Sequence, residues 1–111
     1  MEYLITGSYV ESGSLSNVLT SGASNKLLLK GIHCTNVATA SAQITLKWVD
    51  SSDSNKEYFI AKDVVIPNAS SFQAIDSTFV LDNGDSLKAE ANISNSIQAS
   101  VSYMQITNDE G

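Results

Sequence analysis

The stretch Ala42-Gln43-Ile44-Thr45-Leu46-Lys47-Trp48 alternates apolar and polar residues without a break. The same alternation returns at residues 87–91 and 97–103. Successive side chains of a β-strand point to opposite faces, so a period of two places all the apolar side chains of each stretch on one face. Such strands are typical of antiparallel sheets with one buried face and one solvated face. The sequence therefore predicts a chain built mainly from β-strands.

Outside these stretches, the pattern predicts further short strands separated by turn-forming residues. The expected strands span residues 2–10, 26–37, 42–49, 57–61, 71–75, 78–81, 86–91 and 97–106. Seven to nine short strands spaced about 8–12 residues apart are typical of a sandwich or barrel. No segment carries a helical stripe of apolar residues. We therefore expect an all-β fold, an antiparallel β-sandwich of the immunoglobulin-like or jelly-roll-like type.

Three segments are expected along the chain. Residues 1–25 are predicted to be an N-terminal strand, a pair of short strands joined at Gly13, or an arm that packs on a neighbouring subunit. Residues 26–107 are predicted to form the β-sandwich core, and residues 108–111 an acidic tail. A length of 111 residues is close to the common size of one domain, so a single core is expected.

Short polar clusters predict the connections between strands. Residues 50–55 and 82–85 are rich in Asp, Asn and Ser, whose side chains bond to their own backbone in turns. The second cluster contains an Asn-Gly pair, which favours the left-handed backbone of a tight hairpin. Gly31 interrupts a strand and marks a bulge or a close approach of two backbones. Residues 62–65 are expected to lead out of a strand toward Pro67, which should lie at a strand edge or in a connection.

The apolar positions of the expected strands define a predicted core. The inward-facing residues are Ile32, Cys34, Ile44, Leu46, Trp48, Tyr58, Ile60, Phe72, Phe79, Leu81, Leu87, Ala89, Ala91, Ile97, Ala99, Val101 and Tyr103. Hydrophobic residues make up 42% of the chain, which is typical of a globular protein rather than a disordered one.

The charge balance argues against a nucleic-acid partner. The net charge is −6, and the basic residues are scattered lysines with no arginine among them. Binding to phosphate backbones requires clustered basic residues. No stretch approaches the roughly 20 apolar residues of a membrane helix, and the acidic second residue is unlike a signal peptide. We therefore expect no nucleic-acid or membrane partner and synthesis in a reducing cytoplasm.

The residue types that perform chemistry are sparse, and we predict no catalytic, cofactor-binding or metal-binding residue and no cofactor. His33 and Cys34 are neighbours on an expected strand, so their side chains should point to opposite faces, with the cysteine buried and the histidine at the surface. One cysteine and one histidine do not make a zinc site. The acidic pairs at residues 50 and 53 and at residues 82 and 85 do not match a calcium-binding loop and are explained by turn chemistry.

Aromatic residues raise two further hypotheses. Trp48 and Tyr58 could stack on a sugar, but Trp48 shares the parity of the core residues before it in its strand, which favours a core position. Tyr3, Tyr9 and Phe59 are candidates for surface aromatics at a subunit contact, because aromatic residues are enriched at interface cores.

Five segments together resemble small β-sandwich virion proteins of tailed bacteriophages, notably marine ones. The segments are residues 29–36, 42–49, 60–67, 81–87 and 97–106. The shared pattern is a strand, an Asn-containing turn and a second strand, then an Ile-Pro connection, then a Leu-x-x-Gly-Asp-x-Leu hairpin before a Ser-rich last strand. The resemblance covers about residues 26–107, and residues 1–25 do not match it.

The resemblance implies assembly rather than catalysis. Such proteins decorate capsids, join head to tail or serve as tail accessories. The expectation is therefore a non-enzymatic virion protein, most specifically a capsid decoration or cement protein. It would contact the major capsid protein or other virion proteins and form a homo-oligomer. The alternatives are a neck or tail accessory protein, or a carbohydrate-binding module for host attachment that uses Trp48; an enzyme is disfavoured by the missing site constellations.

Overall fold

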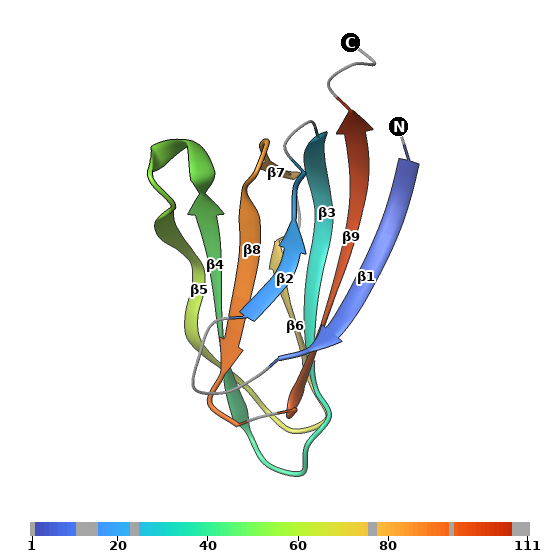
Figure 1. The fold of residues 1–111 in the computed structure, drawn as a ribbon. Coiled ribbons are helices and arrows are strands. Elements are labelled where there is room, and N and C mark those ends of the chain that lie inside the picture. The colour runs from blue at the N-terminus through green and yellow to red at the C-terminus, as the bar shows by residue number, and fades with distance from the viewer. Residues whose placement is uncertain (1, 11–15, 23–24, 76–77, 94, 108–111) are drawn as a thin grey trace.

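The computed structural model describes residues 2–10, 16–22, 25–75, 78–93 and 95–107, which form two antiparallel sheets (Figure 1). The strands are β1 (Glu2–Tyr9), β2 (Ser16–Thr20), β3 (Asn25–Asn36), β4 (Ala42–Asp50), β5 (Lys56–Ile66), β6 (Ser71–Ile75), β7 (Phe79–Leu81), β8 (Ser86–Ala91) and β9 (Ile97–Thr107). The described residues also contain a short 3₁₀-helix, η1 (Ser51–Asp53), and no helix long and apolar enough to cross a membrane.

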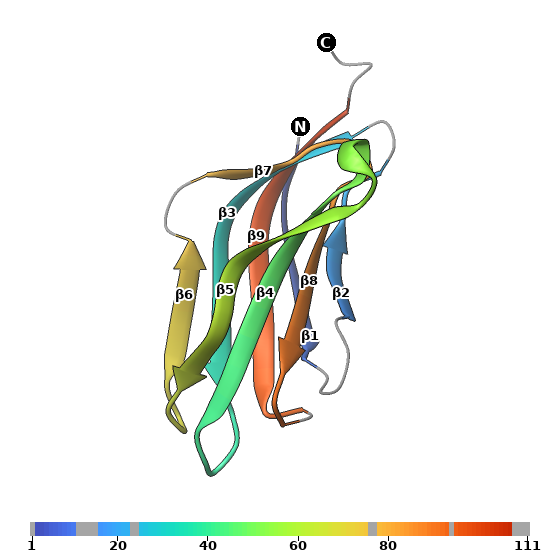
Figure 2. The ribbon, with the colours of Figure 1, turned by 90° about the vertical axis from the view of Figure 1, so that its left-hand side faces the viewer.

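The two sheets are stacked as layers of a sandwich. Sheet A has the strand order β1-β9-β3-β6, with β7 also paired to β3, and sheet B has the order β2-β8-β4-β5. In Figure 2 the strands of sheet B pass in front of those of sheet A. The prediction of an all-β antiparallel sandwich is confirmed.

The pairings nest inside one another along the chain. β1 pairs with β9, β2 with β8, β3 with β6 and β7, and β4 with β5. This nesting results when one long antiparallel hairpin is rolled up and its paired segments alternate between two sheets, which is a jelly roll. Of the two sandwich types expected, the structure is therefore the jelly roll.

The described part of residues 1–25 contributes one strand to each sheet. β1 pairs with β9 in sheet A, and β2 pairs with β8 in sheet B. Gly13 and residues 108–111 lie outside the described residues, so the turn and the tail expected there stay predictions.

The predicted core is confirmed for most positions. The fully buried members are Ile32, Cys34, Ile44, Leu46, Leu81, Leu87, Ala89, Ala91, Ile97, Ala99 and Val101. Trp48, Ile60, Phe72, Phe79 and Tyr103 are partly buried and pack against this cluster. Each large apolar side chain buried in this way contributes about 1.5–3 kcal/mol.

Tyr58 is exposed and does not belong to the core, so the prediction that it is buried there is wrong. It pairs with Trp48 across sheet B and keeps the expected parity. However, β5 is the edge strand of sheet B, and no further strand covers the other side of the Tyr58 ring. Parity therefore predicted the face of this residue but not its position at the rim.

The core also holds residues that the predicted core did not include. These are Val10, Leu27, Leu29, Ala42, Ala61 and Ile66. In β3 the register partner steps from Tyr103 at Leu29 to Ser102 at Gly31, so Lys30 is an extra residue and the parity changes there. The bulge expected at Gly31 is confirmed, and it brings Leu27 and Leu29 onto the same buried face as the residues that follow.

β5 continues to Ile66, so the expectation that residues 62–65 lead out of the strand is wrong. Two register irregularities against β4 allow the strand to continue, and one of them contains Asp63 with a φ of 50°. The backbone N–H of Asp63 donates to Thr45 Oγ1 at 3.0 Å. Pro67 lies in the connection that follows β5, as predicted.

Residues 82–85 form the predicted turn but not the predicted hairpin. The backbone N–H of Asp85 donates to the carbonyl of Asp82 at 3.0 Å, and Gly84 has a left-handed φ of 80°. β7 before the turn belongs to sheet A, whereas β8 after it belongs to sheet B. The turn therefore carries the chain between the sheets, while residues 50–55 do join the paired strands β4 and β5.

Candidate functional site

Cys34 and His33 do not combine into a reactive pair. Cys34 is fully buried in the core, and this burial raises the pKa of its thiol from 9.0 to about 11. His33 lies on the outer face of sheet A and is exposed. The prediction of a buried cysteine beside a surface histidine is confirmed. A nucleophile and its base must lie within hydrogen-bond reach, which this arrangement does not provide.

The burial of Cys34 predicts a loss of stability at alkaline pH. The unfolded chain releases the thiol proton near pH 9, whereas the folded chain retains it until about pH 11, so stability is lost as the pH rises through this window. The contribution is at most about 2–3 kcal/mol. Unfolding free energies of wild type and Cys34→Ala should therefore converge between pH 9 and pH 11. A difference that stays constant across the window would contradict this burial.

The two acidic clusters make contacts within their own turns. Asp50 Oδ1 accepts from the backbone N–H of Ser52 at 3.1 Å and from its hydroxyl at 2.7 Å, which caps η1. Asp53 and Asp82 are exposed. Among the described residues, no three His, Cys, Asp or Glu side chains are grouped so that they could hold a metal ion.

Asp85 is buried and its carboxylate accepts four hydrogen bonds. Oδ2 accepts from the indole N–H of Trp48 and from the backbone N–H of Asp82, each at 3.1 Å. Oδ1 accepts from the backbone N–H of Ser51 at 2.9 Å and from its hydroxyl at 3.1 Å. This one side chain therefore ties β4 and η1 to the turn that crosses between the sheets.

The aromatic residues considered for sugar stacking pack on one another. The rings of Trp48 and Tyr58 stack with centroids 5.1 Å apart, and Phe79 of the other sheet meets Trp48 edge-on at 5.9 Å. Trp48 is partly buried against the core, as predicted. Its indole N–H is bound to Asp85, so the ring is held by the fold rather than presented as a binding platform.

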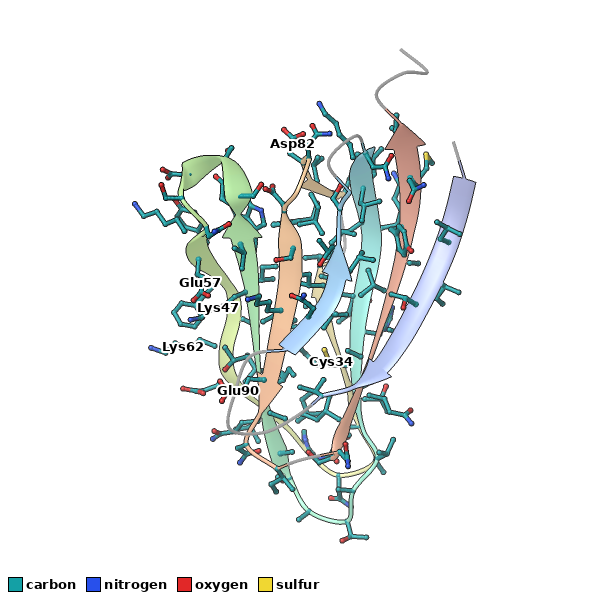
Figure 3. All side chains as sticks on the ribbon, in the orientation of Figure 1. Cys34, Lys47, Glu57, Lys62, Asp82 and Glu90 are labelled. Atoms are coloured by element: carbon teal, nitrogen blue, oxygen red, sulfur yellow. The ribbon has the colours of Figure 1, made fainter. Side chains whose placement is uncertain are left out.

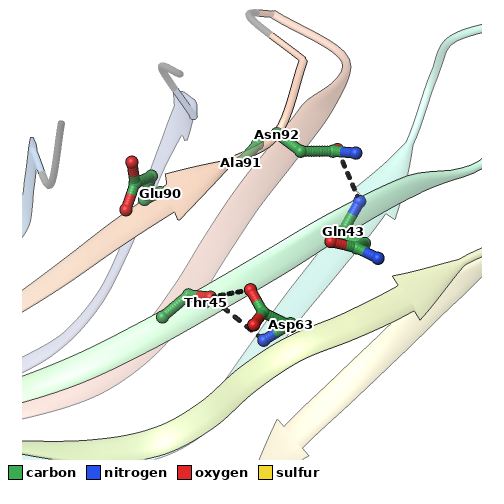
Figure 4. A pocket seen from close by; sticks show the side chains of 6 residues that line it. All are labelled: Gln43, Thr45, Asp63, Glu90, Ala91 and Asn92. Atoms are coloured by element: carbon green, nitrogen blue, oxygen red, sulfur yellow. Dashed lines mark hydrogen bonds between the residues drawn. The ribbon is translucent and has the colours of Figure 1, made fainter. Parts of the chain in front are cut away.

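A shallow hollow of about 160 Å³ lies on the outer face of sheet B (Figure 4). It is lined by Gln43, Thr45, Asp63, Glu90, Ala91 and Asn92. Thr45 and Asp63 bond to each other, and the amide oxygen of Asn92 accepts from the backbone N–H of Gln43. Small-molecule pockets commonly measure about 300–1,000 Å³, so this hollow is small for such a ligand.

Charge is distributed unevenly over the two sheets. The charged residues of the sheet A strands are Glu2, Lys26 and Lys30. Those of the sheet B strands are Lys47, Asp50, Lys56, Glu57, Lys62, Asp63, Lys88 and Glu90. In Figure 3 the labelled residues Lys47, Glu57, Lys62 and Glu90 all lie on the side of sheet B. Sheet A is therefore the face with few charges.

Phe59 is exposed on sheet B among these charges. The ammonium groups of Lys47 and Lys62 lie 4.7 and 5.1 Å from the centre of its ring. Its expected surface position is confirmed, and its role in a subunit contact stays a prediction. The side chains of Tyr3 and Tyr9 lie outside the described part of the chain.

The lower end of the sandwich in Figure 1 is formed by residues 37–41, 67–70 and 92–96, which we call the loop end. The described residues of the loop end carry no charged side chain. Val37 is 48% exposed and Ile93 is 44% exposed, so apolar side chains are presented to solvent there. The end of β4 and the β4–β5 and β7–β8 connections, which contain Asp50, Asp53, Asp82 and Asp85, lie at the opposite end.

Asn36 braces the loop end from within. It is buried, and its side-chain amide donates to the carbonyls of Ala40 at 2.9 Å and Ile66 at 2.8 Å. Its amide oxygen accepts from the backbone N–H of Ala38 at 2.9 Å. Its backbone N–H donates to the carbonyl of Ser70. One residue therefore fixes two of the three connections relative to each other.

The third connection is attached to the first by backbone contacts. The N–H of Val37 donates to the carbonyl of Ser96 at 2.8 Å.

Sequence reasoning did not single out the loop end. The uncharged composition of its three segments was visible, but they are up to about 50 residues apart in sequence, and only the nested strand pairing brings such distant segments to one end.

The comparisons with known proteins give structural matches only. No protein-family model matches the chain, and no curated protein matches it. The chain is similar to two crystal structures of a pentameric capsid protein isolated from metagenomic phage sequences, each with a TM-score of 0.48, 14% identity and 96% of this chain covered. A structure of infectious bursal disease virus strain Gx gives a TM-score of 0.49 and 9% identity over 91% of this chain.

The chain spans less than two thirds of the length of these matched chains, namely 65%, 63% and 30%. We infer nothing about function from likeness at this level of identity and overlap.

Proposed function

We propose that this chain is a structural protein of a virus particle that works by protein–protein contact, and more specifically a decoration or cement protein on the head of a tailed bacteriophage. The observation that carries the proposal is the loop end, an internally braced surface whose described residues carry no charge and which presents Val37 and Ile93. Its partner is an uncharged surface of the major capsid protein or of another virion protein, and its place is the virion.

The loop end is suited to protein contact because it is already ordered. Asn36 holds the connections through three side-chain hydrogen bonds, so little conformational entropy remains to be lost on binding. Interface cores are depleted in charged residues, which matches the composition of these loops. A charged partner surface would lose its hydration against these loops without gaining an opposite charge, so the complementary partner surface is uncharged.

The size of the loop end favours many weak contacts over one strong contact. The cross-section of the molecule measures 28 Å by 19 Å, so an end-on contact covers about 500 Å², less than the about 800 Å² per partner of a standard interface. Several copies held together as a homo-oligomer gain avidity on a surface that repeats the binding site. A protein present in many copies on a particle meets this condition.

Two further observations support the proposal. The segments at residues 29–36, 42–49, 60–67, 81–87 and 97–106 resemble small virion proteins of tailed bacteriophages. The nested strand order is a jelly roll, an architecture shared by viral capsid domains, lectin domains and cupins. Fold alone does not decide among these functions, and the composition and rigidity of the loop end support protein contact.

The copy number in purified particles tests the proposal. Quantitative mass spectrometry of particles from the source of the sequence should find hundreds of copies of this chain per particle. About six or twelve copies would place the protein in the neck or tail, because those rings are cyclic assemblies, and would reject the decoration role. Absence of the chain from purified particles would reject the virion role altogether.

A further inference from the structure

We propose that two copies of this chain pair through β1, antiparallel about a two-fold axis, so that sheet A continues from one copy into the other. The inference rests on the homo-oligomeric state proposed above and assigns a surface to it.

β1 is an edge strand with a regular backbone. It lies at the edge of sheet A, and in the described part of the chain it pairs along one side only, with β9 (Figure 1). All eight residues from Glu2 to Tyr9 pair in register without an irregularity. Ile5 in the middle of the strand is 76% exposed. The other side of β1 therefore presents backbone groups that a further strand can pair with.

The other sheet edges carry the features that discourage such pairing. β5 has two register irregularities and the charged residues Lys56, Glu57, Lys62 and Asp63. β2 is five residues long with an irregularity between Asn17 and Leu19. The remaining edge is divided between β6 and β7, which are five and three residues long. Short length, bulges and charges are the usual means by which native sheets protect their edges.

β1 has none of these features. Its sequence contains no lysine and no proline, and its one charged residue is Glu2 at the start. A long, regular edge with one charged residue and an exposed isoleucine is unfavourable in a free monomer, because it templates pairing with another strand. The contrast with the other three edges indicates that β1 is the edge at which a strand of a partner molecule can pair.

A second copy of this chain is the partner that fits the local charge. The whole chain carries a net charge of −6, so two copies repel each other in most orientations. The strands of sheet A contribute only Glu2, Lys26 and Lys30, and β9 beside β1 carries no charge. Antiparallel pairing also places the two Glu2 residues at opposite ends of the contact, whereas parallel pairing would place them side by side.

The two-fold axis restricts the register of the pair. Directly opposite residues of an antiparallel pair point to the same face. Ile5 and Gly7 are register partners of Ser102 and Ser100 and are exposed on the outer face of sheet A. The registers with the greatest overlap therefore place Ile5 opposite the second copy's Ile5 or opposite its Gly7. In either register the exposed isoleucines approach the axis and are covered.

The contact is small enough to be reversible. Eight residues of extended chain span about 26 Å. With the 19 Å thickness of the molecule, the edge contact covers about 500 Å² per copy, or about 1,000 Å² in total, at the lower limit for specific association. The dimer is therefore expected to have a micromolar dissociation constant.

Sedimentation equilibrium of the full chain tests the proposal over a range from about 5 µM to about 500 µM, which brackets a weak interface of this size. Wild type should show a reversible monomer–dimer equilibrium. Ile5→Lys should weaken it at least about tenfold, because a lysine on an edge strand opposes pairing. Val80→Lys is the matched control, since Val80 is 47% exposed at the opposite edge of the same sheet, and it should dimerise as wild type does.

A spin label locates the contact independently of the lysine variants. Labels on Ile5→Cys should lie within about 20 Å of each other in the dimer, whereas labels on Val80→Cys, three strand spacings from β1, should lie more than about 30 Å apart. The buried Cys34 does not compete for the label.

A wild-type chain that stays monomeric at about 500 µM would overturn the proposal, since that concentration exceeds the expected dissociation constant. The proposal would also be overturned if Ile5→Lys and Val80→Lys weakened the dimer equally, or if Ile5→Lys left the dimer unchanged. It would be overturned as well if the labels at position 80 lay closer together than the labels at position 5. These results concern the free protein, whereas the copy number in particles tests the virion role, so the two failures are distinguishable.

Discussion

Replacing Asp85 with alanine is expected to lower the free energy of unfolding by about 3–4 kcal/mol, because each buried donor left without an acceptor costs about 1–3 kcal/mol. The carboxylate accepts from Trp48, from the backbone of Asp82 and from two donors of Ser51. Only the Ser51 hydroxyl has another acceptor in the structure, the carbonyl of Asn83. The remaining donors are the backbone N–H of Ser51 in η1, the backbone N–H of Asp82 in the turn and the indole N–H of Trp48.

Thermal and urea unfolding followed by the fluorescence of Trp48, the chain's one tryptophan, measures this effect. A loss of this size corresponds to a fall in Tm of about 15 °C or more for a domain of this length. Asp82→Ala is the matched control at the other end of the same turn, where the side chain is exposed, and it should cost less than about 1 kcal/mol. Equal effects of the two variants would contradict the anchoring role of Asp85.

Asn36→Asp is expected to destabilise the fold by about 3 kcal/mol although it changes neither size nor shape, because a buried acceptor left facing an acceptor is costly. The Asn36 amide donates to the carbonyls of Ala40 and Ile66. A carboxylate cannot donate and would face two carbonyl oxygens. The loss should shrink at low pH, where the introduced carboxyl group regains a proton and can donate again.

Asn68→Asp makes the same chemical change at an exposed position of the loop end, and the difference in unfolding free energy between the two variants isolates the role of the Asn36 amide. The control should change stability by less than about 0.5 kcal/mol. Urea titrations at pH 7 and pH 4 measure both. If Asn36→Asp matches the control at neutral pH, the bracing of the loop end is contradicted.

The sequence predicted the fold class and most of the buried face because period-two alternation survives in β4, β8 and β9, where the register is regular. It was less informative where bulges change the parity. Leu27 and Leu29 were missed because Lys30 is an extra residue in β3, and Ile66 was missed because β5 continues through the irregularity at Asp63. Local patterns do not reveal such insertions.

The sequence pattern also did not reveal which strands pair with each other when they lie far apart along the chain. The turn at residues 82–85 was predicted correctly from its Asn-Gly pair, yet it crosses between sheets instead of closing a hairpin. The loop end was missed for the same reason, since Asn36 and Ile66 come into contact only after the hairpin is rolled up. Turn chemistry acts within four residues, whereas the jelly roll is decided by contacts far apart along the chain.

We propose that the loop end is the surface by which this chain binds a virus particle. Binding of isotope-labelled chain to purified particles, measured by co-sedimentation, tests it most directly. The variants are Ile93→Asp at the loop end and Val80→Asp in β7, two apolar residues of similar exposure, 44% and 47%. Both are surface positions, so both variants should fold.

Wild type and Val80→Asp are expected to sediment with the particles in a saturable manner. Ile93→Asp should lose binding at least about tenfold, because a charge placed in an uncharged contact must be desolvated without a partner. Binding of Ile93→Asp equal to that of wild type would contradict the claim, and so would a wild-type chain that does not sediment with particles at all.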